Sequence, residues 1–192
     1  MTAKLTVVTG PMFAGKTETA LRYAKRALLA QRPVQAFVPE LDTRHGVGAV
    51  RSHAGNSLEA LGVSAWTVSQ DNIRDLHKRP RFDNMLVLID EAQFMPDAVI
   101  EQVQLILRKP RHVVVCGLST DFAQRPFGAM PTLLAIADEV VKLTAICSDC
   151  KSDNASLTHR LTASVARVEL GGSDIYAPLC RACYGERVTP RM

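Results

Sequence analysis

The chain has 192 residues, of which 47% are hydrophobic and 22% charged, a balance that excludes an intrinsically disordered protein. A net charge of +4 with only 5% aromatic residues argues against a nucleic-acid-binding surface, and no apolar run is long enough to predict a transmembrane helix. The first residues lead into a strand-like segment without the apolar stretch of a signal peptide, so we expect a cytoplasmic protein without membrane or nucleic-acid partners.

Short apolar segments alternate with amphipathic segments along most of the chain. The apolar segments predict strands at 5–9, 34–38, 85–89, 112–116 and 139–146. Apolar residues at helical spacing predict helices at 16–30, 72–78 and 97–108, and we expect a long loop at 40–57. Buried strands that alternate with helices are typical of a parallel sheet covered on both faces, so we predict an α/β fold.

A phosphate-binding motif follows the first predicted strand and opens the first predicted helix, the context that G-x-x-x-x-G-K-[ST] requires. Its glycines let backbone N–H groups approach phosphate, Lys16 would reach the β- and γ-phosphates, and the Thr17 hydroxyl would bind Mg²⁺. The alternative is an accidental glycine-rich turn. We predict that the whole loop binds ATP: Gly10, Pro11, Met12, Phe13, Ala14, Gly15, Lys16 and Thr17.

Two carboxylates, Asp90 and Glu91, come directly after the apolar strand at 85–89. In P-loop proteins an Asp at this place holds the Mg²⁺ shell together with the hydroxyl of the loop. The second carboxylate is then available to orient water or to accept a proton from a hydroxyl nucleophile. Alone, such a pair is more simply a solvated cap of the next segment, but beside a P-loop it predicts a catalytic site.

Four of the five cysteines form two Cys-x-x-Cys pairs, Cys147 with Cys150 and Cys180 with Cys183. Four thiolates suit tetrahedral Zn²⁺ and leave no open position for water, so the predicted site is structural; four unliganded thiols are the alternative. The long spacer between the pairs predicts a hairpin. We place a P-loop core at 1–145, a zinc lobe at 146–185 and a solvated tail at 186–192.

These motifs together resemble thymidine kinases of the type that joins a RecA-like P-loop core to a zinc-held lobe. The resemblance runs from about Lys4 to Tyr184. It is carried by the P-loop, by Asp-Glu-Ala-Gln-Phe at 90–94, by Gly-Leu-Ser-Thr-Asp-Phe at 117–122, by Pro-Phe-Gly at 126–128 and by Gly-Gly-Ser-Asp-Ile-Tyr at 171–176. Ser119 departs from the pattern, since many relatives have Asp there.

The resemblance implies a role for each matched residue. Glu91 would be the base that takes the proton of the nucleoside 5′-hydroxyl, Asp90 would serve Mg²⁺, and Gln93 would lie beside the phosphates. Asp42 and Arg44 would belong to a loop over the nucleotide. The residues that would contact the nucleoside, several of them in a lasso that closes over the base, are Met12, Leu118, Phe122, Phe127, Arg167, Val168, Glu169, Leu170, Gly171 and Tyr176.

The function that the resemblance implies is ATP:thymidine 5′-phosphotransfer, with deoxyuridine as a poorer substrate, to give dTMP in pyrimidine salvage. It also implies Mg²⁺ with ATP, structural Zn²⁺, a homotetramer and feedback inhibition by dTTP. From the residues alone, two rivals share the P-loop and the zinc: a nucleic-acid-dependent ATPase with a zinc ribbon, and a nucleotide-gated regulator without catalysis. The mild charge and few aromatic residues count against the first rival.

Overall fold

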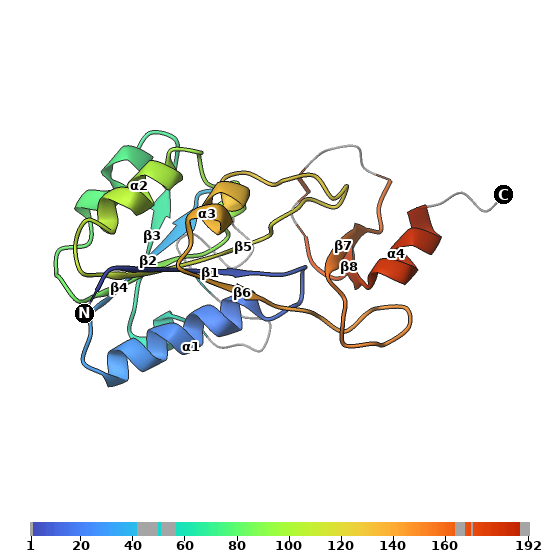
Figure 1. The fold of residues 1–192 in the computed structure, drawn as a ribbon, viewed down its shortest axis with the longest axis horizontal. Helices are drawn as coiled ribbons and strands as arrows, with labels where there is room; N and C mark the ends of the chain where they lie inside the picture. Colours follow the sequence, from blue (N-terminus) through green and yellow to red (C-terminus); the bar gives the residue numbers. More distant parts are fainter. Residues whose placement is uncertain (1, 42–49, 51–56, 164–167, 170, 189–192) are drawn as a thin grey trace.

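The computed structural model describes residues 2–41, 50, 57–163, 168–169 and 171–188, whose arrangement is drawn in Figure 1. Its main feature is a six-stranded parallel sheet in the order β3-β2-β4-β5-β1-β6. The strands of this sheet are β1 (Lys4–Thr9), β2 (Val34–Pro39), β3 (Ala65–Val68), β4 (Leu86–Ile89), β5 (His112–Gly117) and β6 (Glu139–Lys142).

Helices cover both faces of the sheet (Figure 1). One face packs on α1 (Lys16–Leu29), and the other on α2 (Val99–Ile106) and α3 (Met130–Ile136). Three short 3₁₀ helices complete the core: η1 (Glu59–Leu61), η2 (Ile73–Lys78) and η3 (Ala92–Phe94).

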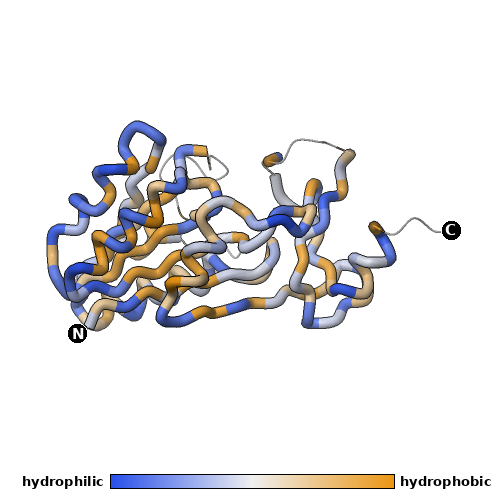
Figure 2. Tube along the Cα trace, turned by 45° about the horizontal axis from the view of Figure 1, so that its top comes forward, coloured by the Kyte–Doolittle hydropathy of each residue, from blue (hydrophilic) through white to orange (hydrophobic). Residues whose placement is uncertain are grey.

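Alternation along each strand explains the two covered faces. In β5, Val113 and Val115 belong to the cluster with α2 and α3, whereas Val114 and Cys116 belong to the cluster with α1. Successive side chains of a strand point to opposite faces, so a continuous apolar run supplies two cores at once. Figure 2 shows these hydrophobic strands running through the middle of the larger part of the molecule.

The carboxyl ends of the central strands meet at one edge of the sheet. Thr9 pairs in register with Gly117, and Ile89 pairs with Val115. The P-loop after β1, the carboxylates after β4 and the segment after β5 therefore emerge side by side, where ligands usually bind in open α/β sheets.

A smaller lobe follows β6. It consists of the antiparallel strands β7 (Leu157–Arg160) and β8 (Tyr176–Leu179) and the helix α4 (Arg181–Val188). The lobe contacts the core directly: the Met12 N–H donates to Thr158 Oγ1 at 3.0 Å, and the Tyr184 hydroxyl donates to the Phe122 carbonyl at 2.9 Å.

The structure confirms the α/β fold with a parallel sheet, the five predicted strands and the hairpin between the cysteine pairs. It corrects several details: 72–78 is a 3₁₀ helix, β6 ends at Lys142 instead of 146, and α4 extends through 186–188, which we predicted as tail. Four described elements of the core were not predicted: β3, α3, η1 and η3. Within the described residues, no helix combines the length and the apolar character that crossing a bilayer requires.

Candidate functional site

A cavity of about 340 Å³ lies between the carboxyl edge of the sheet and the smaller lobe. One wall comes from the P-loop and the segments after β4 and β5, and the other from β7, β8 and the segment between them. Its lining residues are Met12, Phe13, Gly15, Lys16, Thr17, Glu18, Glu91, Gln93, Phe94, Leu118, Thr120, Asp121, Phe122, Phe127, Thr158, Val168, Glu169, Gly171 and Tyr176.

The P-loop is held in place by close backbone contacts. A side chain at Gly10 would put its Cβ 2.6 Å from the Leu143 carbonyl oxygen, so only glycine fits there. Gly15 has a φ of +79° immediately before α1, a conformation that glycine adopts without strain. The buried Lys16 donates from Nζ to the Pro11 carbonyl at 2.8 Å, which keeps its ammonium group over the loop.

The Thr17 hydroxyl donates to Asp90 Oδ2 at 3.2 Å, which joins the P-loop to the end of β4. Asp90 is only 5% exposed. Its burial, and then the neighbouring charge of Glu91, raise the pKa of this carboxyl to about 7. A buried oxygen pair of this kind, one hydroxyl and one carboxylate, fits the ligands that Mg²⁺ takes in nucleotide sites.

Glu91 sits at a sharp turn between β4 and η3. Its φ is +51°, a left-handed conformation that is uncommon for a residue with a side chain and that clusters at functional sites. The turn brings the Glu91 side chain to the cavity, whereas the Asp90 carboxylate stays buried beside Thr17. The two neighbouring carboxylates therefore have different surroundings.

Gln93 lies between Glu91 and the segment after β5. Its side-chain amide donates from Nε2 to Glu91 Oε2, and its Oε1 accepts a hydrogen bond from the Leu118 N–H at 3.0 Å. The residue is buried and lines the cavity.

Aromatic rings also line the cavity. Phe94 and Phe127 pack edge to face, with ring centroids 5.5 Å apart. The guanidinium of the buried Arg160 lies 3.8 Å from the centre of the Phe122 ring, and its Nη2 donates to the Tyr176 hydroxyl at 2.9 Å.

Glu169 connects these rings to the segment between β7 and β8. Its carbonyl accepts a hydrogen bond from the Tyr176 hydroxyl at 2.9 Å, and its carboxylate lies 3.8 Å from Arg160 Nε. A second contact comes from Thr162, whose hydroxyl donates to Glu169 Oε2 at 2.9 Å. Polar contacts of both buried and exposed groups therefore hold this wall of the cavity.

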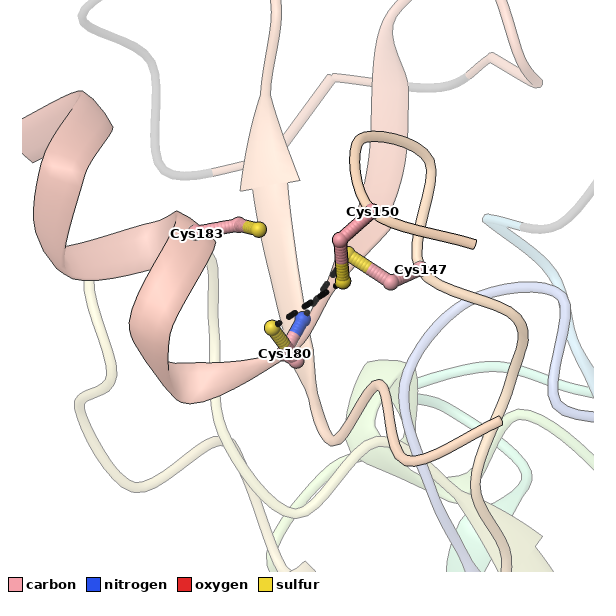
Figure 3. Close-up of side chains that lie close together, drawn as sticks. All are labelled: Cys147, Cys150, Cys180 and Cys183. Carbon is pink, nitrogen blue, oxygen red and sulfur yellow. Dashed lines mark hydrogen bonds between the residues drawn. The ribbon is translucent and has the colours of Figure 1, made fainter. Parts of the chain in front are cut away.

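The four paired cysteines converge in the lobe (Figure 3). Their sulfur atoms all lie within 4.8 Å of one another, and Cys150 Sγ is 3.8 Å from Cys180 Sγ. With Zn–S bonds of the usual length, two sulfurs on a tetrahedral ion are about 3.8 Å apart, so the cluster fits Zn²⁺. Burial opposes ionisation of Cys147, but N–H donors of Cys180, Cys150 and Asp149 outweigh it and lower the pKa of this thiol to about 6.

The structure brings most of the predicted site residues to one cavity. Of the predicted nucleotide and nucleoside contacts, the cavity is lined by Met12, Phe13, Gly15, Lys16, Thr17, Glu91, Gln93, Leu118, Phe122, Phe127, Val168, Glu169, Gly171 and Tyr176. Gly10, Pro11, Ala14 and Asp90 lie next to it without lining it. Asp42, Arg44, Arg167 and Leu170 lie outside the described residues.

Five lining residues were not predicted: Glu18, Phe94, Thr120, Asp121 and Thr158. The sequence could have indicated four of them, because they lie within or beside the motifs at 10–17, 90–94 and 117–122. Thr158 had no such signal, since it lies in a short strand without an apolar pattern.

Comparison with known proteins shows to which family the chain belongs. The family model described as thymidine kinase matches residues 3–184. The chain belongs to the thymidine kinase family.

Several curated relatives are named thymidine kinase. The one from Bacteroides thetaiotaomicron is 40% identical over 94% of this chain and 86% of its own. The one from Pseudothermotoga lettingae is 32% identical over 97% of both chains. The thymidine kinase of Coprothermobacter proteolyticus is 39% identical over 92% of this chain and 87% of its own. Membership of this family implies a phosphotransferase that acts on thymidine.

Proposed function

We propose that the protein transfers the γ-phosphoryl group of Mg²⁺-ATP to the 5′-hydroxyl of thymidine, and less efficiently to that of deoxyuridine, with dTMP as the product from thymidine. The observation that carries this proposal is a single cavity lined both by residues of the P-loop and by the aromatic rings of Phe94, Phe122, Phe127 and Tyr176. Glu91 lines the same cavity, so a base, a phosphate site and a site for a planar ring are within reach of one small substrate.

On the phosphate side, Lys16 and the backbone N–H groups of the loop bind the β- and γ-phosphates and neutralise the charge that develops during transfer. Thr17 and Asp90 hold the Mg²⁺ that accompanies ATP, and this ion supplies further neutralisation when bound. Burial and the neighbouring charge of Glu91 would keep the Asp90 carboxyl partly protonated near neutral pH, and a bound cation would favour its ionised form.

On the nucleoside side, Glu91 accepts the proton of the 5′-hydroxyl as the oxygen attacks the γ-phosphorus. Met12, Leu118, Phe122 and Phe127 surround the pyrimidine, and Tyr176 closes the pocket with the lasso residues Arg167, Val168, Glu169, Leu170 and Gly171. Asp42 and Arg44 cover the nucleotide from the loop at 40–57. Closure of the lasso over the base excludes water, which suppresses hydrolysis of ATP.

The cysteine cluster holds one structural Zn²⁺ in this proposal, because four thiolates complete its tetrahedral shell. Assembly as a homotetramer and inhibition by dTTP belong to the same proposal through the family resemblance. Gel filtration with light scattering tests the first. Inhibition that competes with both substrates tests the second, since dTTP carries both a thymidine and a triphosphate.

The experiment that tests the function measures ATP consumption with thymidine, with single-stranded DNA and with neither. We expect consumption only with thymidine, with one dTMP formed for each ADP. Stimulation by single-stranded DNA would instead indicate a nucleic-acid-dependent ATPase. Binding of ATP without turnover under all three conditions would indicate a nucleotide-gated regulator.

A further inference from the structure

We propose that Gln93 is a positioning residue that fixes the carboxylate of Glu91 relative to the wall of the nucleoside pocket, and that it acts on the reaction through Glu91 instead of binding phosphate. The proposal deepens the phosphotransferase function given above and rests on it. It changes the place that the family resemblance suggests for Gln93, beside the phosphates.

The first argument is the polarity of the two hydrogen bonds. The Gln93 amide donates to a carboxylate oxygen of Glu91, and its oxygen accepts from the Leu118 N–H at 3.0 Å. A carboxylate can only accept and a backbone N–H can only donate, so the orientation of the amide is determined by its partners. Among side chains of this length, only glutamine satisfies both contacts, because glutamate lacks the N–H and methionine lacks both groups.

The second argument is the confinement of Gln93. It is 4% exposed and lies in η3, two residues after Glu91. A Cβ added at Gly117 would lie 2.5 Å from Gln93 Oε1, and one added at Gly128 would collide with the Gln93 backbone carbonyl. Backbone therefore lies against Gln93 at two points where a side chain would displace it, which is the packing expected of a residue that sets the position of another.

The consequence is a rigid connection across the reaction centre. Leu118 lines the cavity where we place the nucleoside, and Glu91 lines it where we place the 5′-hydroxyl. The Gln93 amide spans these two groups, so the carboxylate cannot swing away from the hydroxyl while the pocket keeps its shape. Misplacement of a catalytic group by about 1 Å can cost on the order of 10²-fold in rate.

The primary test is Gln93→Met, which keeps the length of the side chain and removes both hydrogen bonds. We expect kcat for thymidine phosphorylation to fall by about 10- to 100-fold, with the KM values for thymidine and ATP within about twofold of wild type, because the ground-state contacts are retained. A higher KM for ATP with an unchanged kcat would overturn the proposal and assign Gln93 to the phosphates.

A double-mutant cycle separates positioning from a general loss of structure. In the Glu91→Gln background the carboxylate that Gln93 orients is already absent, so adding Gln93→Met should lower the remaining rate by less than about threefold. If Gln93→Met costs the same factor in both backgrounds, Gln93 does not act through Glu91 and the proposal fails.

A second route displaces Gln93 without changing it. Gly117→Ala would push on Gln93 Oε1 and on Met130 Sδ, and Gly185→Ala is the matched control because nothing lies within 4 Å of the added Cβ. We expect Gly117→Ala to reproduce the kcat loss of Gln93→Met while the control keeps wild-type kinetics, with circular dichroism confirming that both are folded. A folded Gly117→Ala enzyme with wild-type kcat would contradict the proposal.

Failure of the proposed function can be recognised separately. If wild-type protein itself fails to phosphorylate thymidine, the proposed function fails, and binding of thymidine by calorimetry then reports on the pocket alone.

Discussion

The two walls of the cavity are held in place by different means. The phosphate wall is attached to the ends of three neighbouring parallel strands, whose backbone pairing fixes Lys16, Asp90 and Glu91 relative to one another. The lobe wall has only two four-residue strands and one helix, and its own buried apolar cluster is small. A lobe of this size needs a metal or other cross-link to keep its fold.

Because the two walls are held differently, mutations in one wall should affect the rate of phosphoryl transfer, and mutations in the other should affect nucleoside binding. Damage to the phosphate wall should lower the rate of transfer with little loss of nucleoside affinity. Damage to the lobe wall should lower nucleoside affinity with little loss of ATP binding. The predictions below test this division, from the largest expected effect to the smallest.

The largest effect is expected for Glu91→Gln, which preserves the shape of the side chain and removes its basicity. Loss of a general base typically costs about 10²–10⁴ in rate, so kcat should fall within that range. The KM values for thymidine and ATP should change little, because the contact matters in the transition state. A variant that keeps more than about a tenth of the wild-type kcat would show that Glu91 is not the proton acceptor.

Asp90→Asn provides the contrast on the neighbouring residue. Asp90 is buried against Thr17 in the place where we expect Mg²⁺, so this variant should bind Mg²⁺-ATP more weakly as well as turn over more slowly. Calorimetric titration with Mg²⁺-ATP measures the difference. Equal ATP affinities in the two variants would contradict the separate roles of the two carboxylates.

Lys16→Ala should remove most of the phosphoryl transfer and spare the nucleoside site. Lys16 is the only cation of the loop at 10–17, and loss of one donor to developing charge costs about 10²–10³ in kcat. Thymidine affinity measured by calorimetry should stay near that of wild type. Loss of thymidine affinity with normal turnover would show that the loop has been assigned wrongly.

Loss of the metal should have the opposite effect to Lys16→Ala: nucleoside binding should weaken, and the phosphate site should be spared. We expect one Zn²⁺ per chain by metal analysis, and Cys180→Ser should lose it. Sites of this kind seldom keep their fold without the metal, so the lobe should loosen and the affinity for thymidine should fall. ATP binding should persist. Purified protein without zinc, or a Cys180→Ser enzyme with a normal thymidine KM, would contradict this prediction.

Tyr184→Phe tests whether the lobe with the proposed metal site supports the nucleoside pocket. Tyr184 follows the ligand Cys183, and its hydroxyl holds the backbone of Phe122 across the boundary between lobe and core. Removal of one hydrogen bond costs about 1 kcal/mol, so the thymidine KM should rise roughly fivefold while zinc content and kcat stay unchanged. Tyr23→Phe on α1 is the matched control. An unchanged thymidine KM in Tyr184→Phe would mean that Phe122 does not depend on the lobe.

The smallest effect concerns the substrate. A missing methyl group costs about 1 kcal/mol in an apolar pocket, or roughly fivefold in kcat/KM, so deoxyuridine should be a poorer but real substrate. A purine nucleoside needs more room than the pyrimidine nucleoside for which we propose this pocket. A kcat/KM for deoxyadenosine comparable to that for thymidine would contradict the proposed pocket.

The sequence predicted the phosphate wall better than the lobe wall, for a physical reason. The P-loop and Asp90-Glu91 each follow a continuous apolar strand, and both the strand and the loop chemistry are local patterns. β3 and α3 were missed because they are short, with four and seven residues. α4 was missed because it has no buried apolar face: it is held by the hydrogen bond of Tyr184 to the Phe122 carbonyl and by the ion pair of Arg187 with Asp149.

Contacts between side chains could not be predicted from local patterns in the sequence. Nothing in the sequence around Gln93 indicates that its amide reaches both Glu91 and Leu118, because that depends on the left-handed turn at Glu91 and on the pairing of β4 with β5. The stacking of Arg160 on Phe122 likewise joins residues 38 positions apart in different parts of the fold. Tertiary structure decides such contacts, whereas propensity decides only the elements that present them.

The contact between Gly10 and Leu143 has a consequence for protein engineering. Leu143 follows β6, and its N–H donates to the Thr9 carbonyl at 2.7 Å, so the start of the connection to the lobe is attached to the base of the P-loop. A chimera that exchanges lobes between relatives should keep its junction after Leu143, so that this contact stays within one parent. A junction inside β6 would place a foreign backbone against Gly10, and the exchanged lobe would then be fused to a distorted phosphate loop.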